Sequence, residues 1–168
     1  MKTGVALSGA MVATMVAVVT TAAAQDQAQL KRGEYLATIM DCTGCHTPGA
    51  LIGKPDMSQA LAGSAIGFQI PGVAVVYPPN LTPDRDTGLG KWSPEDMIKA
   101  IRLGQRPDGR QLIPVMPYPS YATLTDADAA ALVAYLRSLP PVRHAVPAFT
   151  PGDKPAPAPY LTVVDPKR

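Results

Sequence analysis

Apolar residues recur at helical spacing in three stretches of the chain, and each stretch predicts a helix. The first runs from about Gln27 to Asp41 and keeps its charged residues off the apolar face. Gly33 lies on that face. Because glycine weakens a helix interior, it predicts a close crossing with a second helix at this point. The face consists of Leu30, Gly33, Ala37 and Met40.

The last helix has the clearest pattern. Thr125 is a good N-cap, and Asp126 and Asp128 place negative charge in the first turn. Residues 129–139 carry an apolar stripe, and Pro140-Pro141 ends the helix. The stripe consists of Leu132, Tyr135, Leu136 and Leu139. We expect it to form core and to pack on the first helix near Gly33.

A third helix is predicted by the order N-cap, proline, acid at Ser93-Pro94-Glu95-Asp96, and Gly104 is expected to end it. Between Leu61 and Tyr77 the apolar residues alternate instead, on either side of Pro71-Gly72. This pattern predicts a short β-hairpin with a type II turn.

The two ends of the chain differ in composition from the middle. Residues 1–24 contain Lys2, an Ala/Val/Met-rich run and the small residues Ala22-Ala23-Ala24, which together predict a cleaved export signal. An uncleaved membrane anchor is the alternative, because residues 5–24 are just long enough to cross a bilayer. Residues 146–168 form a Pro/Ala-rich tail, expected to be extended and to lie across the domain or across a partner. Residues 25–145 then form one domain, and the expected location is the periplasm.

The chemistry of the chain is concentrated in Cys42-Thr43-Gly44-Cys45-His46, which contains both cysteines of the sequence. C-x-x-C-H is the spacing for covalent haem attachment. Two thiols add to the two vinyl groups of one porphyrin, and the histidine becomes the proximal ligand of the iron. The motif therefore predicts one haem c.

Three other sites use part of the same motif. A structural zinc site needs four ligands, and beyond the motif the chain offers only His144. A thioredoxin-like dithiol requires a βαβ context, which the pattern does not contain. A structural disulfide suits an exported protein but leaves His46 unexplained. Haem attachment is the favoured interpretation among the four.

The ligand on the other side of the iron decides the function. Methionine or a second histidine makes an electron carrier, whereas an open position allows gas binding or peroxide chemistry. Met116 is the favoured distal ligand, because it lies 70 residues after His46 in a proline-stiffened apolar loop. The less suitable candidates are Met40, Met57, Met97 and His144.

Charge narrows the choice of partners. Fifteen basic residues nearly balance thirteen acidic ones, and no basic run suggests a nucleic acid partner. With so little net charge, long-range steering towards a partner should be weak.

Four further segments, together with the C-x-x-C-H motif, match the sequence pattern of a known family. The chain resembles the class I c-type cytochromes, and among them the haem domains of cytochrome c subunits of bacterial membrane-associated alcohol, aldehyde and gluconate dehydrogenases. The resemblance covers about Gly33 to Arg143. It rests on the C-x-x-C-H motif and on Asn80-Leu81-Thr82-Pro83-Asp84, Gly88-Leu89-Gly90-Lys91-Trp92-Ser93, Arg106-Pro107-Asp108-Gly109-Arg110 and Met116-Pro117-Tyr118-Pro119-Ser120-Tyr121.

The resemblance implies an all-α class I cytochrome c fold, with three to four helices wrapped around one covalent haem and a short β-hairpin insertion. It implies thioethers at Cys42 and Cys45, iron ligands His46 and Met116, and no catalytic residue. The common form of the family has three haems, so a single motif suggests a one-haem relay. Among the remaining residues of these segments, we consider four as partners of the haem propionates and one as a residue near the haem edge. The four propionate partners are Arg106, Arg110, Tyr118 and Tyr121, and the residue near the edge is Trp92.

The expected function is therefore periplasmic electron transfer from a dehydrogenase partner to the respiratory chain, by a protein that is not itself an enzyme. A haem enzyme, or a gas- or peroxide-responsive cytochrome with an open or labile distal site, is the alternative. Membrane association is expected only through the partner or an uncleaved leader.

Overall fold

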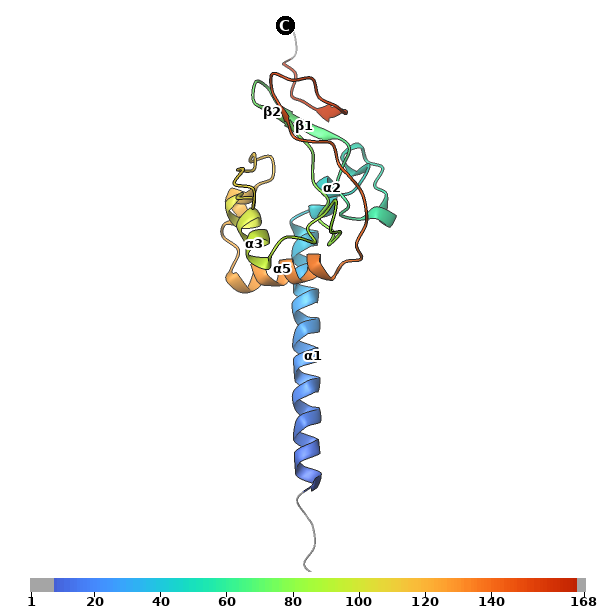
Figure 1. Cartoon of the computed structure of the whole chain (residues 1–168), viewed down its shortest axis with the longest axis vertical. Coiled ribbons are helices and arrows are strands. Elements are labelled where there is room, and N and C mark those ends of the chain that lie inside the picture. The colour runs from blue at the N-terminus through green and yellow to red at the C-terminus, as the bar shows by residue number, and fades with distance from the viewer. Residues whose placement is uncertain (1–7, 166–168) are drawn as a thin grey trace, which may run out of the picture.

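The computed structural model describes residues 8–165, and side chains from Ala24 onward. Within this range, three longer helices form the body of the domain and a small sheet lies at the end opposite the projecting N-terminal helix (Figure 1). The helices are α1 (Ser8–Ile39), α2 (Cys42–His46), α3 (Pro94–Leu103), α4 (Tyr118–Tyr121) and α5 (Asp126–Ser138). Two 3-10 turns, η1 (Ala50–Ile52) and η2 (Met57–Gln59), follow α2. The strands are β1 (Gly67–Ile70), β2 (Ala74–Val76), β3 (Thr150–Pro151) and β4 (Tyr160–Leu161).

Helix α1 begins well before the predicted boundary at Gln27. It extends back to Ser8 and projects from the domain as a long arm (Figure 1). Within the described residues, no helix is long and apolar enough to cross a bilayer. A continuous helix does not test cleavage, and residues 1–7 of the predicted signal lie outside the described range. The export signal stays a prediction.

The crossing predicted at Gly33 is confirmed. Helix α5 lies so close to α1 that a Cβ at Gly33 would be 2.6 Å from Tyr135 Cβ and would collide with the Ala131 carbonyl. An ion pair of 2.8 Å between Arg32 and Asp128 flanks the crossing. The buried core on either side of it consists of Leu36, Ala37, Leu61, Met97, Ile101, Leu132, Val133 and Leu136.

Both predicted helix starts are also confirmed. The Ser93 hydroxyl accepts from the Asp96 backbone N–H at 3.1 Å and the Asp96 carboxylate caps Ser93 in return, which makes a capping box. Gly104 ends α3 with a φ of 68°, as expected for a left-handed C-cap. The Thr125 side chain caps α5 in the same way by accepting from the Asp128 N–H.

Replacing Ser93 with alanine should lower the free energy of unfolding by about 1 kcal/mol, because one N-terminal N–H of α3 loses its acceptor. Urea unfolding followed by circular dichroism measures this. Ser120→Ala, at an exposed position of α4, is the matched control and should leave the midpoint nearly unchanged. Equal midpoints for both variants would mean that the box contributes nothing.

The predicted hairpin is present. Strands β1 and β2 pair antiparallel with Phe68 opposite Val76, and Val73 N–H closes the turn on the Ile70 carbonyl at 2.9 Å. Gly72 has a φ of 72°, which a type II turn requires at its third position.

The all-α description needs correction, because the tail adds two strands to the hairpin. The sheet has the order β3-β2-β1-β4, with β3 antiparallel to β2 and β4 parallel to β1. The prolines of the tail lack an N–H, but the tail residues between them donate backbone hydrogen bonds to the sheet, and the proline carbonyls accept hydrogen bonds from it. Gly152 N–H bonds to the Val73 carbonyl, and Gly67 N–H bonds to the Pro159 carbonyl, both at 2.9 Å. The tail thus lies across the domain, the first of the two arrangements considered.

Candidate functional site

The C-x-x-C-H motif is one turn of helix set at a sharp bend. Asp41, between α1 and α2, has the left-handed φ of 52°, which turns the chain into Cys42. A Cβ at Gly44 would lie 2.6 Å from the Asp41 carboxyl carbon, so a larger residue here would displace the exposed Asp41 side chain. Cys42 and Cys45 are three residues apart on one helical turn, which puts both thiols on the same side. Both are free and half-buried.

His46 is oriented by a hydrogen bond on one ring nitrogen. Its Nδ1 lies 2.8 Å from the Pro79 carbonyl oxygen, and its side chain is 9% exposed. Because a carbonyl only accepts, Nδ1 carries the proton and Nε2 keeps a free lone pair. Burial lowers the pKa of His46, which favours the neutral form that binds metals. A histidine fixed in this way through its second nitrogen is typical of a metal ligand, and the donor set fits a haem iron.

The two thiols do not fit a dithiol redox site. Burial raises the pKa of Cys42 to about 11, and the Asp41 charge acts in the same direction. Burial and Asp41 also raise the pKa of Cys45. Redox dithiols instead need a lowered thiol pKa. In the part of the chain that the structure describes, no group of three or more His, Cys, Asp and Glu side chains is arranged to hold a metal ion, as the zinc interpretation requires.

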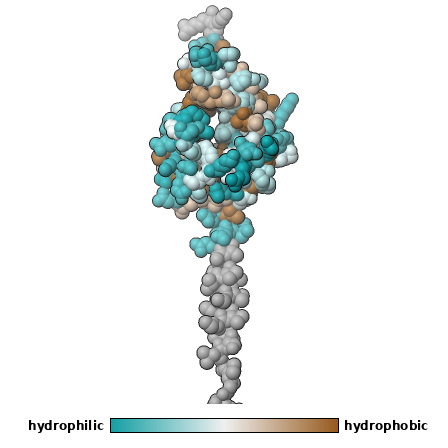
Figure 2. All heavy atoms as spheres, in the orientation of Figure 1, coloured by the Kyte–Doolittle hydropathy of each residue, from teal (hydrophilic) through white to brown (hydrophobic). Residues whose placement is uncertain are grey.

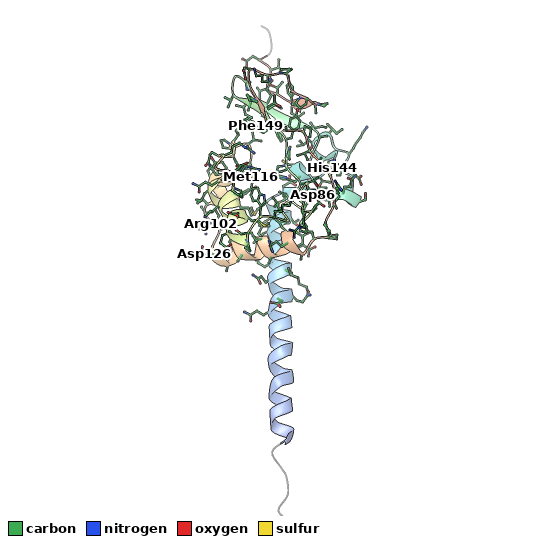
Figure 3. All side chains as sticks on the ribbon, in the orientation of Figure 1. Asp86, Arg102, Met116, Asp126, His144 and Phe149 are labelled. Carbon is green, nitrogen blue, oxygen red and sulfur yellow. The ribbon has the colours of Figure 1, made fainter. Side chains whose placement is uncertain are left out.

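Met116 lies in the loop of residues 105–117, here called the distal loop, between α3 and α4. Figure 3 shows it near the middle of the domain, on the side across from α2 (compare Figure 1). It is half-buried and packs against the edge of the core. The loop closes on α3 through the Leu112 N–H, which bonds to the Gly104 carbonyl at 2.7 Å. The structure thus brings Met116 and the motif to facing parts of the domain.

The other candidate ligands have different surroundings. Met97 is buried in the core, as expected for a gap-filling methionine, and Met57 is 60% exposed in η2. The His144 ring nitrogen Nδ1 lies 2.8 Å from the Ala62 carbonyl, and Figure 3 shows this residue away from Met116.

A buried asparagine next to Pro79 holds the loop that orients His46. Asn80 is 1% exposed and its Nδ2 donates to the Val142 carbonyl at 2.7 Å and to Thr87 Oγ1 at 3.1 Å. Its Oδ1 accepts from the Thr82 N–H at 2.9 Å and the Thr82 hydroxyl at 2.8 Å. The sequence pattern gives Asn80 no such role, since the Val142 carbonyl lies 62 residues away. The one local signal is a polar residue directly after Pro78-Pro79.

Replacing Asn80 with alanine should lower the free energy of unfolding by about 3 kcal/mol, because several buried groups lose their hydrogen-bond partner together. Chemical denaturation of the purified protein measures it. Gln59→Ala is the control, since that amide bonds locally, to Asp56 three residues earlier in the same turn. A loss no larger than that of the control would contradict the role given to the network.

Two of the residues considered for propionates, Arg106 and Tyr121, already have protein partners. The Arg106 guanidinium forms an ion pair with Asp108 at 3.1 Å and lies 5.0 Å above the Trp92 ring. The Tyr121 hydroxyl donates to the Met40 carbonyl at 3.2 Å. Their roles towards a haem remain predictions.

The comparisons with known proteins bear directly on this site. The family model for cytochrome c matches residues 30–140. The chain belongs to the cytochrome c family. A domain of this family carries covalently attached haem c and transfers electrons, and it is not the catalytic subunit of a dehydrogenase. The dithiol and zinc interpretations of the motif therefore give way to haem attachment.

Three relatives confirm the narrower resemblance. The chain is 43% identical over 110 residues to the cytochrome c subunit of the quinone alcohol dehydrogenase of Gluconobacter oxydans. It is 41% identical over 128 residues to the gluconate 2-dehydrogenase cytochrome c subunit of Pantoea cypripedii, and 40% identical over 117 residues to the fructose dehydrogenase cytochrome subunit of Gluconobacter japonicus. These matches cover 66%, 74% and 69% of this cytochrome, but 21%, 27% and 22% of the relatives' own length.

Proposed function

We propose that this cytochrome is a one-haem electron carrier of the periplasm, with thioethers at Cys42 and Cys45 and with iron ligands His46 and Met116. The observation that carries the proposal is the His46 ring, held through Nδ1 by Pro79 with Nε2 left for the metal, inside a C-x-x-C-H turn of a cytochrome c domain.

The chain's own residues account for the properties that an electron carrier needs. Bound haem supplies a one-electron iron couple. The half-buried thiols hold it covalently, the Pro79 carbonyl fixes the His46 ring, and a half-buried methionine sulfur suits the other axial position. Because the ligands are held in place by the fold, little has to move when the iron changes oxidation state.

A separate dehydrogenase is proposed to supply the electrons. The relatives named above are cytochrome subunits of alcohol, gluconate and fructose dehydrogenases. The sequence of this chain contains one C-x-x-C-H motif. We therefore propose a relay with one haem, which passes electrons from the dehydrogenase subunit to the respiratory chain.

The experiment that tests this role is a redox titration of the protein matured with the c-type haem attachment machinery. We expect one reversible one-electron transition and a ferrous spectrum that does not change under carbon monoxide. Ready carbon monoxide binding by the wild type would instead indicate an open or labile distal site. The protein would then be a haem enzyme or a gas- or peroxide-responsive cytochrome.

A further inference from the structure

The segment that leads from the domain into the tail runs along one half of the domain and is fixed to it. In residues 142–151, here called the strap, the Val142 N–H donates to Thr82 Oγ1 at 3.1 Å and the His144 N–H donates to Thr87 Oγ1 at 3.0 Å. The His144 ring bonds to the Ala62 carbonyl, just before the segment that leads into the hairpin. Thr150 then pairs with Val75 of β2. These contacts attach the strap to the half of the domain that contains the C-x-x-C-H motif.

One side chain of the strap contacts the distal loop, on the other half of the domain. The Arg110 guanidinium of the distal loop lies over the Phe149 ring, 5.0 Å from its centre. Among the hydrogen bonds, ion pairs and cation–π contacts of residues 24–165, this is the one that joins the distal loop to the strap. Figure 3 shows Phe149 and Met116 towards the same middle part of the domain, with Phe149 nearer the sheet.

The surroundings of the Arg110 guanidinium favour its contact with the Phe149 ring. Within the described part of the chain its guanidinium makes no ion pair. Burial and the charge of Arg106 lower the pKa of Arg110, and the Asp108 carboxylate acts in the opposite direction. The Phe149 ring gives this cation a favourable contact on the strap. Figure 2 shows hydrophobic residues gathered towards the sheet end of the domain, where Val73, Phe149, Tyr160 and Leu161 are exposed.

We propose that Phe149 and Arg110 are positioning residues for Met116. Their contact joins the distal loop to the strap, which holds Met116 in place and keeps competing ligands off the iron. The proposal rests on the function proposed above, because it takes Met116 as a ligand. The distal loop is otherwise held by hydrogen bonds at its base, such as Leu112 to Gly104, by the Arg106 contact with Trp92 and by the packing of Met116 on the core. A further contact between the loop and the strap makes the loop open less easily.

The test measures how tightly imidazole binds the ferric holoprotein, since imidazole competes with Met116 for the sixth position. Phe149→Leu keeps an apolar side chain but removes the aromatic face, and Arg110→Gln removes the cation. Each should raise the affinity for imidazole about two- to fivefold, the size expected for one exposed cation–π contact. The double variant should match the singles and not multiply them, since both changes break the same contact. Urea midpoints should move little, because Phe149 is 41% exposed.

Tyr160→Ala is the matched control. Tyr160 is an aromatic residue of the same tail with 39% exposure, but it belongs to β4, which pairs with β1. Its imidazole affinity should equal that of the wild type. Unchanged affinity in Phe149→Leu, or an equal change in Tyr160→Ala, overturns the positioning role. A wild type whose imidazole affinity is unaffected by Met116→Ala instead overturns Met116 as ligand, so the two failures are distinguishable.

Discussion

Replacing Met116 with alanine should turn a ferrous protein that does not respond to carbon monoxide into one that binds it stoichiometrically. The variant loses the methionine sulfur that we propose as the sixth ligand, and alanine offers no donor. The ferric spectrum should at the same time lose the weak methionine-to-iron band. Visible spectra of both oxidation states, with and without carbon monoxide, measure both effects.

Met57→Ala is the control for this result, because Met57 is an exposed methionine in η2 whose loss should leave both spectra unchanged. Carbon monoxide binding that is the same in wild type and Met116→Ala would contradict the assignment. If Met57→Ala alone opened the site, the distal ligand would have to come from the motif side of the domain.

Replacing Gly33 with leucine should lower the free energy of unfolding by about 3 kcal/mol. A side chain at this position meets the Ala131 carbonyl and Tyr135 Cβ, so α1 and α5 must move apart and the core between them must open. Thermal unfolding of the holoprotein measures the loss. Because α1 leads directly into Cys42, we also expect a lower yield of haem-loaded protein.

Ala28→Leu introduces the same side chain on the exposed part of α1 and serves as the control. It should unfold at the wild-type temperature. Equal stability for Gly33→Leu and Ala28→Leu would show that the helix crossing tolerates a large residue, contrary to the close approach of α1 and α5.

The parts of the fold that were predicted correctly depend on residues close together in the sequence. Ser93 and Thr125 mark helix starts because capping involves residues within three positions. The hairpin follows from alternation around Gly72, and the crossing follows from a glycine that has no other reason to lie within an apolar face. The C-x-x-C-H motif predicts its chemistry for the same reason, since both thiols and the histidine share one helical turn.

The parts that were missed depend on partners far away in the chain. The tail strands form because Pro151 and Tyr160 meet a hairpin that lies much earlier in the sequence, at Ala74 and Gly67. Asn80 is important because Val142 comes to it across 62 residues. Proline content indicated an extended tail correctly, but composition carries no information about which sheet edge such a tail will join.

The facing positions of Met116 and the motif depend on the same long-range packing. Proline stiffening made the distal loop a good candidate, yet its place opposite α2 follows from α3 and α4, which flank the loop and pack against each other, while α3 also packs against α5. Arg110 illustrates the difference. Its charge suggested a propionate partner, which stays a prediction, and the fold adds a contact with Phe149 that the sequence did not indicate.

The most direct test of covalent haem attachment is the intact mass, under denaturing conditions, of the protein matured with the c-type haem attachment machinery. We predict the polypeptide mass plus one haem, and the bare polypeptide mass for the Cys42→Ser/Cys45→Ser variant. A wild type that loses its haem on denaturation, or that never acquires one, would contradict covalent attachment at this motif and with it the proposed electron relay.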